Sequence, residues 1–250
     1  MLNIFYINMD KNTDRNDFMI QQLNKYDYKI NRIAGIDGLK LKDFDYRNKI
    51  SSMLNIDTAY LGEPWLKCRS NFKTMSSNID YILPRFGLYL STIKLIKTAI
   101  MNGLNSCVIL EDDAIIKNEI KIPNIDADLI YLGATFKGDR YAEGELICVD
   151  PKKIVLFGTF GYYVNNCQAF LKVLEAPFQG GRSFDKHDLW RSGNIKLRCQ
   201  NIDSFIKNHY QMNGTVYFVN PQTISHPTKN ISTINTKQYN YSNNNLRFEY

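Results

Sequence analysis

The sequence predicts an α/β fold, a single domain in which a mixed, mostly parallel sheet is flanked by helices and followed by a C-terminal extension. Two observations support this. The chain opens with a strand, a helix and a second strand, and its middle alternates apolar segments of strand length with helical patterns. Parallel strands need such crossover helices. We place the domain at residues 1–227 and a polar, Asn-rich tail at residues 228–250.

The start of the chain predicts a β-α-β unit. Residues 2–7 and 28–34 are rich in β-forming side chains, and the second segment ends before Gly35. The residues between them predict a helix, because polar residues able to cap its first turn precede apolar residues at helical spacing. The capping candidates are Asn12, Thr13 and Asp14, and the predicted apolar face consists of Phe18, Ile20 and Leu23.

The middle of the chain predicts further alternation of helices and strands. Residues 39–84 are polar with weak periodicity, which indicates an insertion or loosely ordered helices. Residues 86–103 predict a buried helix ending at Gly103, since apolar side chains recur at helical spacing. The remaining predicted elements are strands at 107–110 and 128–136, a strand or hairpin at 155–165, and a helix at 167–176 that Pro177 ends.

The composition argues against a nucleic-acid-binding protein. The chain has 31 Lys and Arg against 25 Asp and Glu, a net charge of +6, and no dense basic run. This mild excess of positive charge suits a ligand that carries phosphate groups. Five cysteines without a CxxC pair predict free thiols and no structural zinc.

The sequence also shows no targeting segment. Its N-terminal residues, LNIFYINMD, lack a basic region and a long apolar region, so no signal peptide is predicted. No apolar run approaches the ~20 residues that span a bilayer. We therefore expect a cytoplasmic protein without an integral membrane segment.

Three adjacent carboxylates, Glu111, Asp112 and Asp113, follow the apolar strand at residues 107–110. Ligands of α/β sheets bind beyond the carboxyl ends of strands. Because side chains alternate along a strand, we expect Glu111 and Asp113 to share one face and Asp112 to point the opposite way. Two carboxylates at a strand end suit a hard divalent cation that also binds phosphate oxygens. Alternatively, the three residues form a solvated acidic turn.

Five segments in order resemble glycosyltransferase family 25, which includes lipooligosaccharide and collagen galactosyltransferases. The resemblance covers about residues 1–175. It implies a GT-A, Rossmann-type fold, a UDP-sugar donor, and Mn²⁺ or Mg²⁺ held by a DxD-type motif that Glu111, Asp112 and Asp113 supply. The segments are IFYINMDKNTDR, RIAGIDG, RFGLYLSTIKLIKTAIMNGLNSCVILEDDAII, DLIYLG and FGTFGYYV.

The resemblance also implies positions for donor-binding residues. His226 is a candidate third metal ligand, since GT-A enzymes often recruit one late in the chain. One departure is the pair Ser91-Thr92, where family members commonly have Ser-His, so no role for that His transfers to this chain. The implied nucleotide-binding residues are Ile7, Asn8, Arg15 and Asp112, with Ala34, Gly35 and Asp37 lining the uridine and ribose, and the implied metal ligands are Glu111 and Asp113.

Transfer with inversion, usual for this family, needs a general base for the acceptor hydroxyl. The resemblance leads us to expect an Asp before an apolar or aromatic pair, and both Asp185 and Asp188 qualify. His187 is an alternative base. The segment also fits an ordinary helix start with Ser183 or Asp185 as N-cap.

The sequence thus predicts a metal-dependent glycosyltransferase that moves a sugar from a UDP-sugar to a hydroxyl of a glycan or glycosylated protein. One alternative is a non-catalytic relative that binds glycans or nucleotide sugars. The other is a Mg²⁺-dependent phosphotransferase with an aspartyl nucleophile. Such enzymes usually place the acidic motif after an early strand with a nearby Thr, whereas here it is mid-chain and followed by Ala114.

Overall fold

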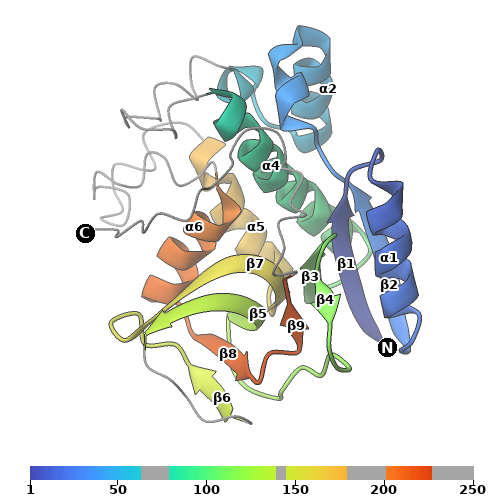
Figure 1. Ribbon diagram of the computed structural model, residues 1–250. Coiled ribbons are helices and arrows are strands. Elements are labelled where there is room, and N and C mark those ends of the chain that lie inside the picture. The colour runs from blue at the N-terminus through green and yellow to red at the C-terminus, as the bar shows by residue number, and fades with distance from the viewer. Residues whose placement is uncertain (63–78, 139–144, 179–200, 227–250) are drawn as a thin grey trace, which may run out of the picture.

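A seven-stranded sheet forms the centre of the molecule (Figure 1). The computed structural model describes residues 1–62, 79–138, 145–178 and 201–226. The strands of this sheet are β1 (Leu2–Asn8), β2 (Tyr28–Ala34), β3 (Cys107–Glu111), β5 (Leu129–Gly138), β6 (Glu145–Cys148), β7 (Ile154–Val164) and β8 (Val216–Asn220). Their order is β2-β1-β3-β7-β5-β8-β6. Strands β2, β1, β3, β5 and β8 run in one direction and β7 and β6 in the other, which confirms the mixed, mostly parallel sheet.

Helices cover both faces of the sheet (Figure 1). One face carries α4 (Ile79–Met101), α5 (Cys167–Glu175) and α6 (Ile202–Ile206), and the other carries α1 (Thr13–Leu23). A two-stranded sheet of β4 (Ile115–Ile116) and β9 (Ile224–Ser225) lies on the α1 face. The shorter elements are η1 (Gly38–Lys42), α2 (Phe44–Leu54), η2 (Thr58–Leu61), η4 (Ala176–Phe178) and the π-helical turn η7 (Lys207–Gln211).

The alternation of side chains along the central strands produces two hydrophobic cores. In β1, Phe5 and Ile7 pack in the core beneath α4, whereas Ile4 and Tyr6 pack in the core beneath α1. The buried residues of β3 alternate in the same way. Strands buried on both faces are typical of parallel sheets covered by helices.

The β-α-β unit forms as predicted, but the predicted apolar face of α1 is wrong in part. Phe18 is 42% exposed and Ile20 is 37% exposed, while Met19 and Leu23 are fully buried. The buried stripe also contains Gln22, whose amide donates to the Ala114 carbonyl at 3.0 Å. Gln22, which bonds the chain around β4, therefore shares the buried side of α1 with Met19 and Leu23.

Residues 39–84 are more ordered than predicted where the structure describes them. The side chain of Asp43 caps α2 by accepting from the Tyr46 amide at 2.7 Å. Ile50 and Leu54 bury one side of this helix. Helix α4 begins at Ile79, seven residues before the predicted start at 86, and contains Pro84. The segment is thus a packed extension, and residues 63–78 lie outside the described part.

Close backbone packing joins α4 to the loop after β2. A Cβ on Gly87 would lie 2.5 Å from the Ile36 carbonyl oxygen, and one on Gly38 would lie 1.7 Å from the Leu83 carbonyl oxygen. The C-terminal end of α4 is as predicted: Gly103 has φ +73° and its amide donates to the Ile100 carbonyl at 2.9 Å. Gly38 and Gly87 are needed at these contacts, because a side chain at either position would collide with the backbone of the facing segment and push α4 away from the loop.

The second half of the described chain follows the predicted order. Strands β5 and β7 pair antiparallel, β7 is one continuous strand rather than a hairpin, and α5 follows it. Cys107, Cys148 and Cys167 are free thiols. Within residues 1–62, 79–138, 145–178 and 201–226, no helix is long and apolar enough to cross a membrane.

Candidate functional site

A pocket of about 170 Å³ lies beyond the carboxyl ends of β1, β2 and β3. This is where ligands bind in α/β sheets. Apolar side chains and the backbone of residues 35–39 form one part of its wall, and charged side chains form the rest. The lining residues are Ile7, Met9, Lys11, Asn12, Arg15, Gly35, Ile36, Asp37, Gly38, Leu39, Pro84, Leu88, Ser91, Glu111, Asp112 and Asp113.

Most of the sequence-predicted donor and metal residues meet in this pocket. Asn8, Ala34 and His226 are exceptions, since none of the three lines it. Asn8 is buried and supports Asp112 from behind, and the Ala34 carbonyl accepts from Lys94 Nζ at 2.9 Å. The predicted residues in the lining are Ile7, Arg15, Gly35, Asp37, Glu111, Asp112 and Asp113.

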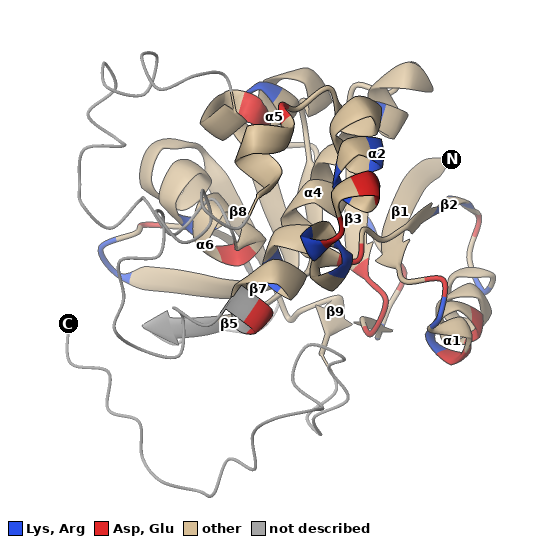
Figure 2. Cartoon of the chain, turned by 90° about the horizontal axis from the view of Figure 1, so that it is seen from above, with Lys and Arg blue, Asp and Glu red and all other residues tan. Residues whose placement is uncertain are grey.

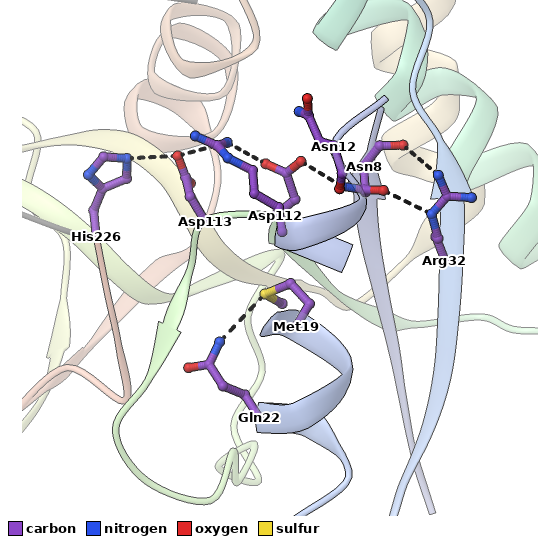
Figure 3. A network of polar contacts seen from close by, with 9 residues as sticks. Asn8, Asn12, Met19, Gln22, Arg32, Asp112, Asp113 and His226 are labelled. Atoms are coloured by element: carbon purple, nitrogen blue, oxygen red, sulfur yellow. Dashed lines mark hydrogen bonds and ion pairs between the residues drawn. The ribbon is translucent and has the colours of Figure 1, made fainter. Parts of the chain in front are cut away.

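Asp112 is held by the first β-α-β unit (Figure 3). Arg15 Nη1 lies 2.8 Å from Asp112 Oδ1, and Asn8 Nδ2 donates to Asp112 Oδ2 at 2.9 Å. Arg32 Nε in turn donates to Asn8 Oδ1 at 3.0 Å and orients that amide. In Figure 2 the red turn after β3 lies beside the loop that leads into α1. The network fixes one carboxylate of the acidic turn against residues near the N-terminus.

Asp113 lies between the guanidinium of Arg15 and the imidazole of His226. Arg15 Nη1 is 3.4 Å from Asp113 Oδ2, and His226 Nε2 is 3.3 Å from the same oxygen (Figure 3). Burial opposes ionisation of this carboxyl. The hydrogen bond and charge of His226, together with Arg15, outweigh burial and lower the pKa of Asp113 below its ordinary value. Asp113 is therefore a carboxylate at neutral pH.

His226 reaches Asp113 because β9 crosses the sheet at a pair of glycines. Gly133 in β5 pairs with Gly161 in β7. A Cβ on Gly133 would lie 2.3 Å from the Ile224 carbonyl oxygen, and one on Gly161 would lie 2.4 Å from Ile224 Cδ1. The His226 ring also packs on Phe160, with ring centroids 4.8 Å apart. The predicted third ligand thus comes to the acidic turn from the far end of the described chain.

Glu111 faces a different part of the structure from the other two carboxylates. Thr159 Oγ1 in β7 contacts Glu111 Oε1, and it lies 2.7 Å from Asp203 Oδ1 in α6. The prediction that Asp112 points away from Asp113 is therefore wrong, since Arg15 Nη1 contacts both, whereas the charges of Asp113 and His226 both act on Glu111. Strand β3 ends at Glu111, so the alternation stops there, and Asp112 and Asp113 both turn to Arg15.

Burial and the neighbouring carboxylates strongly affect Glu111. Burial, followed by the charges of Asp203 and Asp113, raises the pKa of Glu111 to about 8. Burial also raises the pKa of Asp203. A Thr hydroxyl has one proton, so it donates to one carboxyl group and accepts from the other only when that group is protonated. This cluster therefore holds a proton at neutral pH.

Three buried polar atoms around the pocket have no hydrogen-bond partner among the described residues. They are Arg15 Nη2, Asp113 Oδ1 and Asn12 Nδ2. Each belongs to a residue that is 8% exposed and lines the pocket. Buried polar atoms are nearly always paired, so unpaired donors and an unpaired carboxylate oxygen indicate groups that can pair with a ligand.

The donor atoms around the acidic turn would form only part of the coordination shell of a divalent cation. In the part of the chain that the structure describes, no group of three or more His, Cys, Asp or Glu lies close enough to hold a metal ion. Asp113 and His226 lie side by side, and Glu111 lines the same pocket. Carboxylate oxygens and imidazole nitrogen are ligands of Mn²⁺, and substrate oxygens commonly complete such a shell.

The loop after β2 is fixed by side chains of other elements. The Ile36 amide donates to Ser91 Oγ at 2.8 Å, and the Asp37 amide donates to the Tyr46 hydroxyl at 3.0 Å. The Ser91 hydroxyl donates to the Gly87 carbonyl. Ser91 therefore supports the loop, so the apolar part of the wall is formed before any ligand binds.

Some predicted and some unexpected residues complete the site. Asp185, His187 and Asp188, the predicted base candidates, lie outside the described residues. Thr159 and Asp203 were not predicted, although Thr159 is the one aliphatic hydroxyl residue of β7, which is a signal that sequence analysis could have used. Asp203 follows Asn201 at the start of a short helix and has no such signal.

Comparisons with known proteins identify a family. The model described as glycosyltransferase family 25 (LPS biosynthesis protein) matches residues 1–155, more than half of the chain. Among solved structures, the chain is similar to the nucleoside-diphosphate-sugar pyrophosphorylase from Vibrio cholerae RC9. The two chains are 10% identical over an alignment that covers 87% of this chain and 71% of that chain, and the TM-score is 0.38. The search of curated proteins found no match.

Proposed function

The chain belongs to glycosyltransferase family 25, and on this basis we propose that it transfers a sugar from a UDP-sugar to a hydroxyl of a glycan or glycosylated protein. We propose further that the reaction depends on Mn²⁺ or Mg²⁺ and inverts the configuration at the anomeric carbon of the sugar. The observation that carries the proposal is the pairing, in one pocket, of an apolar wall with unpaired buried charges. A nucleotide sugar has this same division between a base and a diphosphate.

The apolar part of the pocket fits the nucleoside. Met9, Ile36 and Leu88 form a surface against which a flat base can pack, and Asp37 offers a carboxylate to ribose hydroxyls. Gly35 leaves room, because a Cβ there would lie 2.8 Å from Met9 Sδ. This assignment agrees with the implied positions of Gly35 and Asp37 at the uridine and ribose.

The charged part of the pocket fits a diphosphate and a cation. Arg15 Nη2 is an unpaired buried donor, which suits a phosphate oxygen. Asp113 Oδ1 is an unpaired carboxylate oxygen, and with His226 and Glu111 it would hold the cation. When bound, the cation supplies positive charge against the leaving diphosphate. Asp112 contributes by holding Arg15 in place through the ion pair at 2.8 Å.

The acceptor side requires a base, because inversion takes place in one displacement and the acceptor hydroxyl must lose its proton. Asp185 remains our first candidate, with Asp188 and His187 as alternatives. Replacing the base with Asn should lower transfer by about 10²–10⁴-fold while UDP-sugar binding persists. The neighbouring Asp should tolerate the same change. If both Asn variants transfer sugar at the wild-type rate, the base is elsewhere.

A panel of UDP-sugars, incubated with the protein and Mn²⁺ or EDTA, tests the proposed function. We expect slow release of UDP from one UDP-sugar, with Mn²⁺ but not with EDTA, because water replaces the acceptor. Metal-dependent binding of UDP without UDP release from any donor would instead indicate a non-catalytic binding protein. Release of inorganic phosphate from simple phosphate esters would indicate a phosphotransferase or phosphatase.

A further inference from the structure

A polar cluster of Glu111, Thr159 and Asp203 borders the pocket on the side away from Arg15. Thr159 is 3% exposed, and its hydroxyl contacts carboxyl oxygens of both acidic residues. The three residues come from β3, β7 and α6, and the last two lie beyond the residues that the family model matches. Of the three, only Glu111 lines the pocket.

The position of the Asp203 carboxyl group is not explained by capping of α6. Asn201 caps this helix, and its side chain accepts from the Asp203 amide at 3.1 Å. The Asp203 carboxyl group is therefore not needed as a cap. It points instead to Thr159, 44 positions earlier in the chain. The positive charge of Arg85, in α4, acts favourably on it.

Two carboxyl groups on one nearly buried hydroxyl are an unfavourable arrangement for stability alone. Burial disfavours each charge, and the two acidic groups repel one another when both are ionised. Features that weaken a fold in this way are expected where they serve a site. The pocket beside Glu111 supplies such a site.

We propose that Thr159 and Asp203 are positioning residues of the transferase site, which hold Glu111 at the pocket wall. Thr159 fixes Glu111 Oε1, and Asp203 fixes the hydroxyl of Thr159. The described residues offer no hydrogen-bond partner to the second oxygen of Glu111, which stays available to a ligand. The role in catalysis rests on the proposed function, whereas the coupling among the three side chains does not.

The predicted consequence is a loss of rate rather than of donor affinity. Mutation of a residue that orients a site group typically lowers activity or metal affinity by about 10–100-fold. We expect Thr159→Val to lower the kcat of Mn²⁺-dependent UDP release by about 10-fold or more, with the KM for the UDP-sugar changed little. Thr159→Ser keeps the hydroxyl and should keep most of the rate. Thr98→Val is the matched control, because among the described residues the Thr98 hydroxyl bonds only the Lys94 carbonyl within α4.

A double-mutant cycle separates positioning from general damage. If Thr159 and Asp203 act through Glu111, then Thr159→Val and Asp203→Asn should have little further effect on kcat in a Glu111→Gln background. The same fold-loss in both backgrounds would overturn the proposal. So would a wild-type rate in Thr159→Val.

The same cycle in thermal unfolding, without ligand or metal, tests the cluster independently of the activity. We expect the change in Tm of Thr159→Val/Glu111→Gln to differ from the sum of the two single changes, since the residues share a hydrogen bond. Additive changes in Tm would overturn the proposal whatever the enzyme does. Absence of UDP release in the wild type, with coupled changes in Tm, would reject the proposed function and the catalytic role while supporting the coupling of the cluster.

Discussion

The two sides of the pocket satisfy their charges in different ways. On the side that we call the arginine wall (Asn8, Arg15, Arg32 and Asp112), carboxylate and amide oxygens bond guanidinium or amide nitrogens at 2.8–3.0 Å. On the side that we call the carboxyl wall (Glu111, Thr159 and Asp203), two acidic groups contact one hydroxyl. In the first arrangement both oxygens of Asp112 are paired without any ligand, while Arg15 Nη2 has no partner among the described residues. The second arrangement is short of positive charge.

This difference indicates which wall responds to pH and to cations. An ion pair with a permanently charged guanidinium keeps its carboxylate ionised over a wide pH range. Carboxyl groups that share a hydroxyl respond to pH, because burial favours their protonated form. We therefore expect the arginine wall to stay in place while the carboxyl wall changes with pH and with cations.

The pH dependence of stability should have opposite signs for Glu111 of the carboxyl wall and for Asp113, the second carboxylate that Arg15 contacts. The pKa of Glu111 is about 8 in the folded protein and near 4.5 in the unfolded chain, so the folded state holds an extra proton between these values. Its contribution is present below pH 4.5 and is lost as the pH rises towards 8. Asp113, beside Arg15, has a lowered pKa, so its contribution is lost as the pH falls below 3.8.

Urea unfolding of the metal-free protein between pH 3 and 9 measures both effects. Glu111→Gln should flatten the fall in the free energy of unfolding between about pH 4.5 and 8. Asp126→Asn, which changes an exposed Asp, should leave that slope unchanged. A slope that persists in Glu111→Gln would show that another group titrates.

Removal of Arg15 should be the most damaging change on the arginine wall. Arg15→Gln leaves Asp112 and Asp113 without their shared partner, and breaking a buried ion pair costs about 3–5 kcal/mol. We expect Mn²⁺ alone to stabilise this variant more than the wild type, because a cation can take the place of the guanidinium. Urea unfolding with and without Mn²⁺ measures both effects.

Arg32→Gln is the matched control for Arg15→Gln. Arg32 is more exposed and bonds Asn8 and Asp10, so its loss should cost less and should not alter the response to Mn²⁺. Equal destabilisation by the two changes would contradict the special position of Arg15 between the carboxylates.

The glycine pair under β9 should control the position of His226. A methyl group at Gly161 would lie 2.4 Å from Ile224 Cδ1 and 2.9 Å from Leu110 Cδ2. Gly161→Ala should cost about 1–3 kcal/mol as an overpacked site and should weaken Mn²⁺-dependent UDP binding by moving β9. Gly103→Ala costs about 1 kcal/mol through its positive φ and should leave UDP binding intact. Titration calorimetry distinguishes the two.

The smallest effect is expected on the outer side of α1. Phe18→Ser replaces a side chain that is 42% exposed, so the free energy of unfolding should change by less than about 0.5 kcal/mol. Met19→Ala, one position later, should cost about 2–5 kcal/mol because Met19 is fully buried. Urea unfolding measures both, and equal costs would show that the helix packs through its predicted face.

The family resemblance placed three residues of the arginine wall, Asn8, Arg15 and Asp112, at the donor site, whereas Arg32 was not predicted. Asn8 ends β1 and Asp112 follows β3, and parallel strands bring such ends to one edge of the sheet. The partners of each carboxylate were not predicted. The three acidic residues were expected to alternate, but β3 ends at Glu111 and the turn after it follows its own contacts.

The carboxyl wall could not be predicted because long-range packing creates it. Thr159 lies 48 positions from Glu111 and 44 from Asp203, and no local pattern links them. The order within residues 39–62 was missed for a different reason. Asp43, Ile50 and Leu54 stabilise α2 through one cap and two buried side chains, which is too little periodicity to recognise in a polar segment.

Titration of UDP into the protein, with Mn²⁺ and with EDTA, tests most directly whether the acidic turn holds a nucleotide through a cation. For the wild type we predict binding that Mn²⁺ strengthens and EDTA weakens. Asp113→Asn should lose about 10-fold or more of the affinity in Mn²⁺ and most of the response to EDTA. Asp126→Asn should behave as wild type, and all three proteins should be folded at the temperature of the titration. Equal affinity in Mn²⁺ and EDTA for the wild type, or an unchanged metal response in Asp113→Asn, would contradict the account.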